Sequence, residues 1–428
     1  MAAEASGEVI RDLRVGVPSV LFLLMLGACD PGSIPSVASV RDSAGVTLVE
    51  NHPGEGPLAY IARLDSSYLR IGVLEGDPAY IFSSVVGLRG LDGGGVLVAE
   101  SQARELRVYD ASGSHVRTFG GRGDGPGEFA SLSGLVGLSG DTVWAWDSRS
   151  RRLTSYLTSG ELIGTVTSAG DPGGRIRELH RLSDGTYVAL SRWGSGLTSS
   201  RESQDLAVVR DTIVLRRLDA TLQELDTIAV LPSSESLRES QITSRNQTAA
   251  NGEIRTVMSG SIRQTERPFG RTSYYHPRLP GVVTATNDSY EWIVRALDGS
   301  VRLISRVPDF NRPISTGRVT ELRDWFLSNG TSPERMREAF EDFPLPDLAP
   351  AFGPIRVDPR GRVWLAEYKA VPNTASIWIV FSPDGQLLGQ VEVPPGLEVH
   401  EIGDDYLLGV QRDEFDVPYV LRFRLVEI

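Results

Sequence analysis

Three of the five histidines in this chain lie at a similar place, four residues before a residue that favours a turn. The pairs are His180 with Asp184, His276 with Pro280, and His400 with Asp404. A turn is expected after each histidine-bearing strand, because Asp, Pro and Gly supply the backbone angles that tight turns need. If these strands are equivalent members of a repeat, the three imidazoles face one shared space.

Three imidazoles around one space suit a metal ion. Neutral ring nitrogens are preferred ligands of zinc and copper, so the pattern suggests a divalent metal, Zn²⁺ above all, at His180, His276 and His400. Arg356 holds the matching place in a later copy, where it would repel a bare cation and could hold an anionic substrate. Alternatively, each imidazole is bonded to backbone or to a carboxylate, because a slip of one residue turns a side chain to the other face of a strand.

Other residues with catalytic potential have structural explanations. The sequence contains no Gly-x-Ser-x-Gly and no His-Glu-x-x-His, so no catalytic or cofactor-binding residue is predicted. The glycine-rich run 120–127, which includes Arg122-Gly-Asp, lacks a following Lys-Ser or Lys-Thr and is interpreted as a connector. Glu100, Asp147 and Glu367 each end a predicted strand. We expect them to lie in a solvated turn or to accept hydrogen bonds from neighbouring backbone N–H groups.

The elements that carry these residues repeat along the chain. Five segments each consist of an apolar run, a tight turn with Gly or Asp, and a second apolar run. They span 108–119, 155–166, 217–225, 295–304 and 380–391. Each is typical of a β-hairpin. A hairpin pattern that recurs about every forty residues is typical of a β-propeller, in which each blade is built from two hairpins.

The spacing predicts an all-β fold, a six-bladed β-propeller closed by an N-terminal strand, over residues 58–428. The predicted sixth blade, 398–426, has only three strands. We expect the run Ala59–Ile71 to supply the fourth strand and so to remove both exposed sheet edges. Helical periodicity predicts a small two-helix insertion at about 315–343, between blades four and five.

The segment 84–166 carries a family resemblance. Gly-Pro-Gly-Glu-Phe129 precedes a strand that ends in Asp147, and Arg151-Arg152-Leu153 follows. This segment resembles an NHL repeat, and the chain as a whole resembles six-bladed propeller lipoproteins with NHL-like repeats. Some enzymes with NHL-type propellers, the peptide-amidating lyases, hold a metal at the propeller axis with channel histidines. The resemblance therefore implies a metal-dependent lyase or lactonase-type enzyme as the alternative to a binding module.

The N-terminus predicts export and a lipid anchor. The apolar stretch Val15–Ala28, which follows basic residues, is typical of a secretion signal. Leu-Gly-Ala-Cys29 resembles the lipobox of bacterial lipoproteins, which implies a lipid on Cys29; the alternative is a buried apolar cysteine. We expect a signal peptide over 1–28, a lipidated tether over 29–57, and an extracytoplasmic, membrane-anchored protein on the periplasmic or cell-surface side.

The charge limits the classes of partner. The formal net charge is −12, which argues against nucleic acid and against adsorption to anionic lipid. The membrane contact is then through the lipid alone. We expect a monomeric propeller that binds a protein or a small-molecule ligand, with insertions at 192–205, 233–266 and 308–350 that lengthen its loop surface. Whether the chain is an enzyme stays open at this point.

Overall fold

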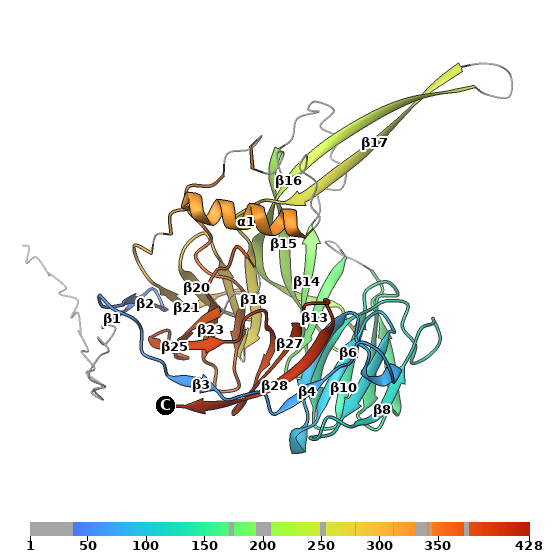
Figure 1. The fold of residues 1–428 in the computed structure, drawn as a ribbon, viewed down its shortest axis with the longest axis horizontal. Coiled ribbons are helices and arrows are strands. Elements are labelled where there is room, and N and C mark those ends of the chain that lie inside the picture. The colour runs from blue at the N-terminus through green and yellow to red at the C-terminus, as the bar shows by residue number, and fades with distance from the viewer. Residues whose placement is uncertain are drawn as a thin grey trace, which may run out of the picture.

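The computed structural model describes residues 37–170, 175–193, 207–248, 254–278, 280–310, 312–329, 340–341, 345–371 and 376–428. Of residues 193, 239–248 and 254–263 it describes the backbone alone. β-Strands dominate this part of the chain and form six sheets that stand around a common centre, with one long helix on the outside (Figure 1).

The first two sheets each have four antiparallel strands in chain order. The first contains β5 (Val85–Gly90), β6 (Val96–Glu100), β7 (Glu105–Tyr109) and β8 (His115–Gly120); the second contains β9 (Leu132–Ser139), β10 (Thr142–Asp147), β11 (Arg152–Leu157) and β12 (Leu162–Thr167). The hairpins turn at Gly113 and Gly160, whose φ angles of 83° and 88° favour glycine. The hairpins predicted over 108–119 and 155–166 are therefore confirmed.

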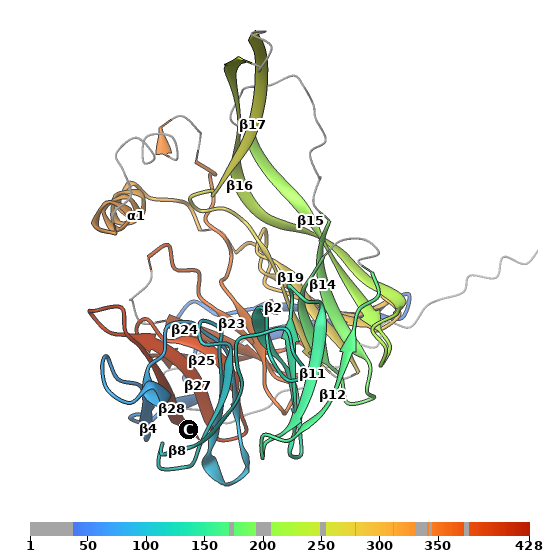
Figure 2. The same cartoon turned by 90° about the vertical axis from the view of Figure 1, so that its right-hand side faces the viewer.

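The third sheet carries a long extension. Its strands are β13 (Ile176–Arg181), β14 (Tyr187–Trp193), β15 (Ala207–Leu218), β16 (Glu224–Thr248) and β17 (Ile254–Glu266). The pairing of β16 with β17 runs from Ser236↔Glu266 to Thr248↔Ile254, and this hairpin projects far beyond the other sheets (Figures 1 and 2). The predicted insertion at 233–266 is thus an antiparallel ribbon. Most of the predicted insertion at 192–205 lies outside the described residues.

The fourth sheet recruits the N-terminal segment. Its strands are β18 (Ser273–Arg278), β19 (Gly281–Thr286), β20 (Glu291–Ala296), β21 (Val301–Arg306), β2 (Val46–His52) and β1 (Val37–Ser43). β2 pairs in parallel with β21. The buried Asn51 side chain bonds Ser305 Oγ at 3.2 Å and the Gly385 carbonyl at 3.0 Å, and it accepts from Leu387 N at 2.8 Å.

This arrangement corrects the predicted tether over 29–57. From Val37 onward the segment is a β-hairpin that belongs to a sheet. The composition suggested a tether because the segment is rich in Ser and Gly, whereas the parallel partner that orders it lies about 250 residues away in the chain.

The fifth and sixth sheets end the chain. The fifth contains β22 (Ile355–Val357), β23 (Val363–Ala366), β24 (Ser376–Phe381) and β25 (Leu387–Val393); the sixth contains β26 (Glu398–Ile402), β27 (Tyr406–Arg412) and β28 (Pro418–Glu427). β28 also pairs antiparallel with β3 (Ala62–Leu64) and β4 (Leu69–Ile71). Residues 62–71 of the predicted closing run therefore lie along the last strand, whereas Tyr60 pairs with Gln390 on β25.

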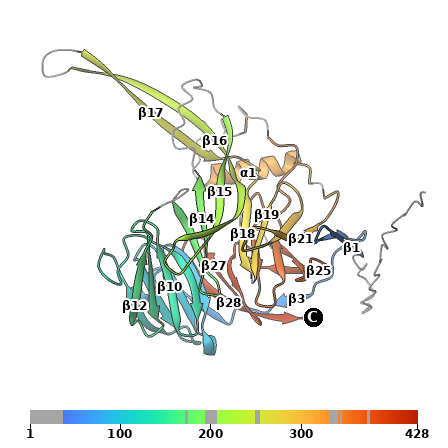
Figure 3. The same cartoon turned by 180° about the vertical axis from the view of Figure 1, so that it is seen from behind.

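The hydrophobic core lies between the sheets. Six clusters of buried side chains each join neighbouring sheets. Examples are Leu106 with Leu135 between the first and second sheets, and Leu88 with Leu408 between the first and sixth. Buried aliphatic and aromatic surface is the main stabilising contribution in such packing. The predicted all-β, multi-sheet architecture is confirmed, and the sheets are arranged as in a β-propeller (Figure 3).

Helix α1 (Thr316–Ser328) lies between the fourth and fifth sheets in the chain, as predicted. Ser315 caps it by accepting from Arg318 N, and Leu322 packs with Phe269 and Ala349. The helix lies on the same side of the sheets as the β16–β17 hairpin (Figures 1 and 2). Most of the second predicted helix lies outside the described residues. Within the described ranges, no helix is long and apolar enough to cross a membrane.

Candidate functional site

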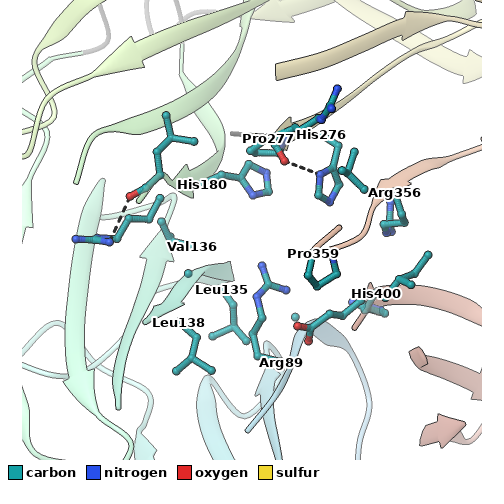
Figure 4. A pocket seen from close by; sticks show the side chains of 18 of the residues that line it. Arg89, Leu135, Val136, Leu138, His180, His276, Pro277, Arg356, Pro359 and His400 are labelled. Carbon is teal, nitrogen blue, oxygen red and sulfur yellow. Dashed lines mark hydrogen bonds between the residues drawn. The ribbon is translucent and has the colours of Figure 1, made fainter. Parts of the chain in front are cut away.

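A cavity of about 600 Å³ lies where the first strands of the sheets end. All six sheets contribute to its lining (Figure 4). One representative from each is Arg89 on β5, Leu138 on β9, His180 on β13, His276 on β18, Arg356 on β22 and Glu401 on β26. A cavity of this size is typical of sites for small molecules.

The strand register explains why three of these side chains reach the cavity. Arg89 pairs with Leu97, His180 with Val188, and Arg356 with Trp364. Each stands one pair before the last pair of its hairpin ladder, so the three occupy equivalent positions.

The other two histidines differ in register. His276 stands one pair further from its turn, and His400 is unpaired at an irregularity between Val399 and Glu401. The predicted equivalence of the three histidines therefore does not hold residue by residue. All three nevertheless line the same cavity, as does Arg356.

Arg89 is one of the cavity residues that the sequence analysis missed. It stands only three residues before Asp92, so counting back four residues from the turn passes over it. The ladder pairing places it level with His180 and Arg356. Counting residues back from the start of the following apolar strand, instead of from the turn, would have included Arg89 among the candidate cavity residues.

His276 is held neutral. Its Nδ1 lies 2.8 Å from the Pro277 carbonyl oxygen, so Nδ1 carries the proton and donates (Figure 4). Burial, with the Arg356 charge acting in the same direction, lowers the pKa of His276 to about 3. Nε2 is therefore a hydrogen-bond acceptor at neutral pH.

His400 is also neutral at ordinary pH. Burial lowers its pKa to about 3, and the charges of Arg356 and Arg89 act in the same direction. Its buried Nε2 makes no hydrogen bond within the described part of the chain, and it lies 3.6 Å from the Glu398 carboxylate. A buried polar atom without a hydrogen bond is unusual, and this nitrogen has an unused capacity to donate or accept one.

His180 belongs to a hydrogen-bonded group at one wall of the cavity. The Tyr275 hydroxyl donates to Glu178 Oε2 at 2.8 Å and lies 3.0 Å from His180 Nε2. Burial alone would raise the pKa of Glu178, but the nearby His180, 3.8 Å away, and the hydrogen bond from Tyr275 outweigh it and lower the pKa. Glu178 is therefore ionised. Burial and the Glu178 charge raise the pKa of Tyr275, which keeps its proton.

Four arginines line the cavity, and none forms an ion pair with a carboxylate within the described ranges. Their guanidinium groups donate to main-chain oxygens: Arg89 to Leu88, Arg181 to Leu182, Arg278 to Pro383, and Arg356 to Ile355 and Val399. Arg181 also stacks over Trp144, with 4.1 Å between its guanidinium carbon and the ring centroid. The positive charges are thus fixed in position without being neutralised.

The carboxylates of the cavity are fewer and mostly engaged. Asp358 pairs with Arg362 at 2.6 Å and accepts from Trp364 Nε1, so its charge is neutralised locally. Glu401 accepts from Gly90 N and from the Tyr406 hydroxyl. Because the arginines outnumber the ionised carboxylates that remain, the cavity is positively charged inside a protein whose net charge is −12.

The donor set does not fit a metal ion well. No group of three His, Cys, Asp or Glu side chains in the described part of the chain gathers closely enough to hold one. His180 Nε2 is engaged by Tyr275, and Arg89 and Arg356 stand where they would repel a cation. A zinc site at His180, His276 and His400 stays a prediction.

The carboxylates at the ends of the second strands are structural. Glu100 accepts hydrogen bonds from the backbone N–H groups of Ser83, Ser84 and Ala103, and Asp147 from those of Ala130, Ser131, Arg149 and Ser150. The predicted backbone-capping role of these two is confirmed. Glu367 instead pairs with Arg312 and Lys369. The glycine-rich run joins β8 to β9, as predicted for a connector.

The proposed lipidation site, Cys29, lies outside the described residues. The structure therefore gives no information on the predicted signal peptide over 1–28 or on the anchor.

Comparison with models of known protein families finds no match, and neither does comparison with curated protein sequences. Among solved structures, the chain is similar to a member of the DUF4221 family from Bacteroides vulgatus, at 11% identity and a TM-score of 0.46, with 86% of this chain and 99% of that one covered. It is similar to the calcium-binding protein regucalcin from Agrobacterium tumefaciens, at 12% identity and a TM-score of 0.40, with 86% and 97% covered. Virginiamycin B lyase from Staphylococcus aureus matches at 10% identity and a TM-score of 0.39, with 84% and 99% covered. Likenesses this distant carry no argument about function, so the site is interpreted from this chain alone.

Proposed function

We propose that this chain is an extracytoplasmic binding protein: a closed six-bladed β-propeller, anchored through a lipid on Cys29, that takes a small-molecule ligand into its central channel. The single observation that carries the ligand-binding part is the cavity of about 600 Å³, to which every sheet contributes. Its fixed arginines and unbonded His400 nitrogen supply polar groups that a ligand would engage.

The closed ring is supported by packing and pairing. The six core clusters join each sheet to the next and the sixth to the first. β3 and β4 cover the edge of β28 that would otherwise be open. A ring closed by a segment from the N-terminal side holds the strands that line the channel in fixed positions, as a preformed binding site requires.

A cavity-filling variant tests the binding function. Thermal shifts would be measured for wild-type protein with a panel of small neutral, cationic and anionic compounds. We expect shifts that Leu138→Trp abolishes, because Leu138 lines the cavity. Leu162→Trp is the matched control, since Leu162 is 37% exposed on the outer strand β12. An absence of shifts, or shifts that persist in Leu138→Trp, would contradict binding in the channel.

The proposed lipid anchor on Cys29 is tested by a separate experiment. Cys29→Ala should release the protein from the membrane fraction and abolish labelling with a fatty-acid probe. A variant that still fractionates with membranes and still takes the label would rule out the lipobox interpretation.

A channel-centred enzyme of the metal-dependent lyase or lactonase type is the second candidate. The observation in its favour is that His180, His276 and His400 line one cavity. Elemental analysis of the purified wild-type protein and of the His180→Ala/His400→Ala double variant distinguishes a metal-dependent enzyme from a binding protein without a metal. Metal present in the wild type and lost in the variant would favour the enzyme, whereas equal metal content would leave the histidines without a metal-binding role.

A further inference from the structure

We propose that the channel ligand is an amphipathic organic anion, a molecule with a carboxylate or phosphate head and an apolar body. This inference rests on the proposed binding function and names the class of ligand. Two features of the lining carry it: one part of the wall presents unneutralised positive charge, and the neighbouring part is apolar (Figure 4).

The positive part of the wall is built around Arg89 and Arg356. Both stand at the same level of their ladders, on the first and fifth sheets, and the sixth sheet with His400 lies between them. Arg89, Arg356 and His400 all line the same cavity, so the three groups face one space. Each guanidinium is anchored by main-chain oxygens and forms no ion pair within the described residues. Arginine suits this role because its planar fork matches the paired oxygens of carboxylate and phosphate groups.

The histidines are consistent with an anion held by arginines. His276 and His400 are both neutral, so they add hydrogen-bonding capacity without further charge. A neutral His400 can hold its proton on Nε2, the buried atom that has no hydrogen bond, and donate it to a ligand oxygen. A cationic ligand would meet the arginine charges instead, at a cost that rises in a partly buried site.

The apolar part of the wall comes from one strand. The residues that β9 contributes to the lining are Leu135, Val136, Gly137 and Leu138, none of which is polar. They lie beside Arg89, since Leu135 packs against Gly87 on the same strand as Arg89 (Figure 4). Gly137 leaves room for Arg181, because a Cβ there would lie 3.1 Å from the Arg181 Cβ. A ligand that fills the cavity therefore has an apolar surface next to its charged group.

The test uses ligands that differ only in the head group. Binding of hexanoate, hexyl phosphate, hexanamide and hexylamine to the full folded protein would be measured by thermal shift and titration. The same four head groups on a phenylpropyl body form a second set. We expect the carboxylate or the phosphate to bind at least about tenfold more tightly than the amide, since hydrogen bonds to charged groups are the stronger ones. The amine should not bind. Whichever anion is preferred identifies the head group.

Arginine variants complete the test. Arg89→Gln and Arg356→Gln should each weaken binding of the preferred anion about tenfold and leave the amide unaffected. Arg302→Gln is the control with the same charge change, because Arg302 is exposed on β21 and outside the cavity lining. If Arg356→Gln fails to fold, the anion affinity of Arg89→Gln alone tests the proposal.

The outcomes separate the two proposals. Amide or amine binding as tight as that of the anion, or equal losses in Arg302→Gln and Arg89→Gln, would overturn the anionic ligand but not the channel. If no compound binds with a signal that Leu138→Trp abolishes, the binding function itself fails.

Discussion

Some buried side chains at the two ends of the sheets differ in the partners that they have. At the ends of the second strands, Glu100, Asp147 and Asn287 direct their side chains to backbone groups and leave little hydrogen-bonding capacity unused. At the other end, around the cavity, the arginines form no ion pair within the described residues, and His400 Nε2 has no hydrogen bond.

If the proposed binding function is correct, this difference separates groups that stabilise the fold from groups that a ligand would engage. Satisfied buried polar groups stabilise a structure, whereas incompletely satisfied ones cost free energy and persist where function needs them. Substitutions at the first end should therefore affect stability, and substitutions at the cavity should affect stability little and binding strongly.

Asp147→Ala should have the largest effect. Asp147 is fully buried and accepts hydrogen bonds from four backbone N–H groups, which the substitution would leave without a partner. We expect a loss of about 3–5 kcal/mol in the free energy of unfolding, measured by denaturant titration. The exposed Asp141→Ala is the control. Equal losses in both variants would remove the assigned structural role.

Asn287→Ala should have a smaller effect of about 2 kcal/mol. The side chain accepts from Thr272 N at 2.7 Å and donates to the Phe352 carbonyl at 3.0 Å, so it joins the fourth sheet to the segment before β22. Ser289→Ala, at an exposed position two residues later, should leave the free energy of unfolding unchanged. A stable Asn287→Ala protein would show that this end of the sheet tolerates unsatisfied groups as well as the cavity does.

On acidification, polar groups at the two ends of the sheets should lower the stability of the protein in different pH ranges. The folded-state pKa of His400 is about 3, below its ordinary value of 6.5, so the unfolded chain takes up the proton first and stability falls as the pH drops from about 6.5 toward 3. His400→Gln should reduce this loss by roughly 1–2 kcal/mol between pH 7 and pH 5. Denaturation curves at several pH values measure it, with the exposed His52→Gln as control.

Asp147 should act in a lower pH range. Burial alone would raise its pKa, but the surrounding N–H groups outweigh it and lower the pKa below the ordinary 3.8. The contribution of the Asp147 carboxylate to the free energy of unfolding is therefore complete above about pH 5 and is lost only as the pH falls below about 4. His276 should lose stability in the same range, so a loss between pH 7 and pH 5 that His400→Gln leaves unchanged would contradict the contribution assigned to His400.

Arg89→Gln should have the smallest effect on stability, within about 0.5 kcal/mol. Among the described residues, the guanidinium donates to the carbonyl of the preceding residue, Leu88, and its removal relieves repulsion with Arg356. Thermal unfolding of the ligand-free protein measures the change. A large loss would place Arg89 among the structural groups and would weaken its use as a probe of ligand binding.

Much of the fold was predictable because its elements are local. The hairpins of the first two sheets follow from alternating apolar residues and from turns such as those at Gly113 and Gly160, which depend on a few neighbouring residues. The β1–β2 hairpin was not predictable as part of a sheet, because its partner β21 is distant in the chain and parallel pairing leaves no turn signal between the two strands.

The sequence by itself determined the strands, the turns and the presence of histidines and Arg356 near the ends of inner strands. Only the tertiary structure decided which side chains meet, because residues at a similar distance from a turn differ in strand register. His400 is unpaired at an irregularity, His276 stands one pair further from its turn, and Arg89 joins the site. The tertiary structure also decided the charge states. Burial beside fixed guanidinium groups keeps the imidazoles of His276 and His400 neutral, and burial is a property that spacing in a sequence does not contain.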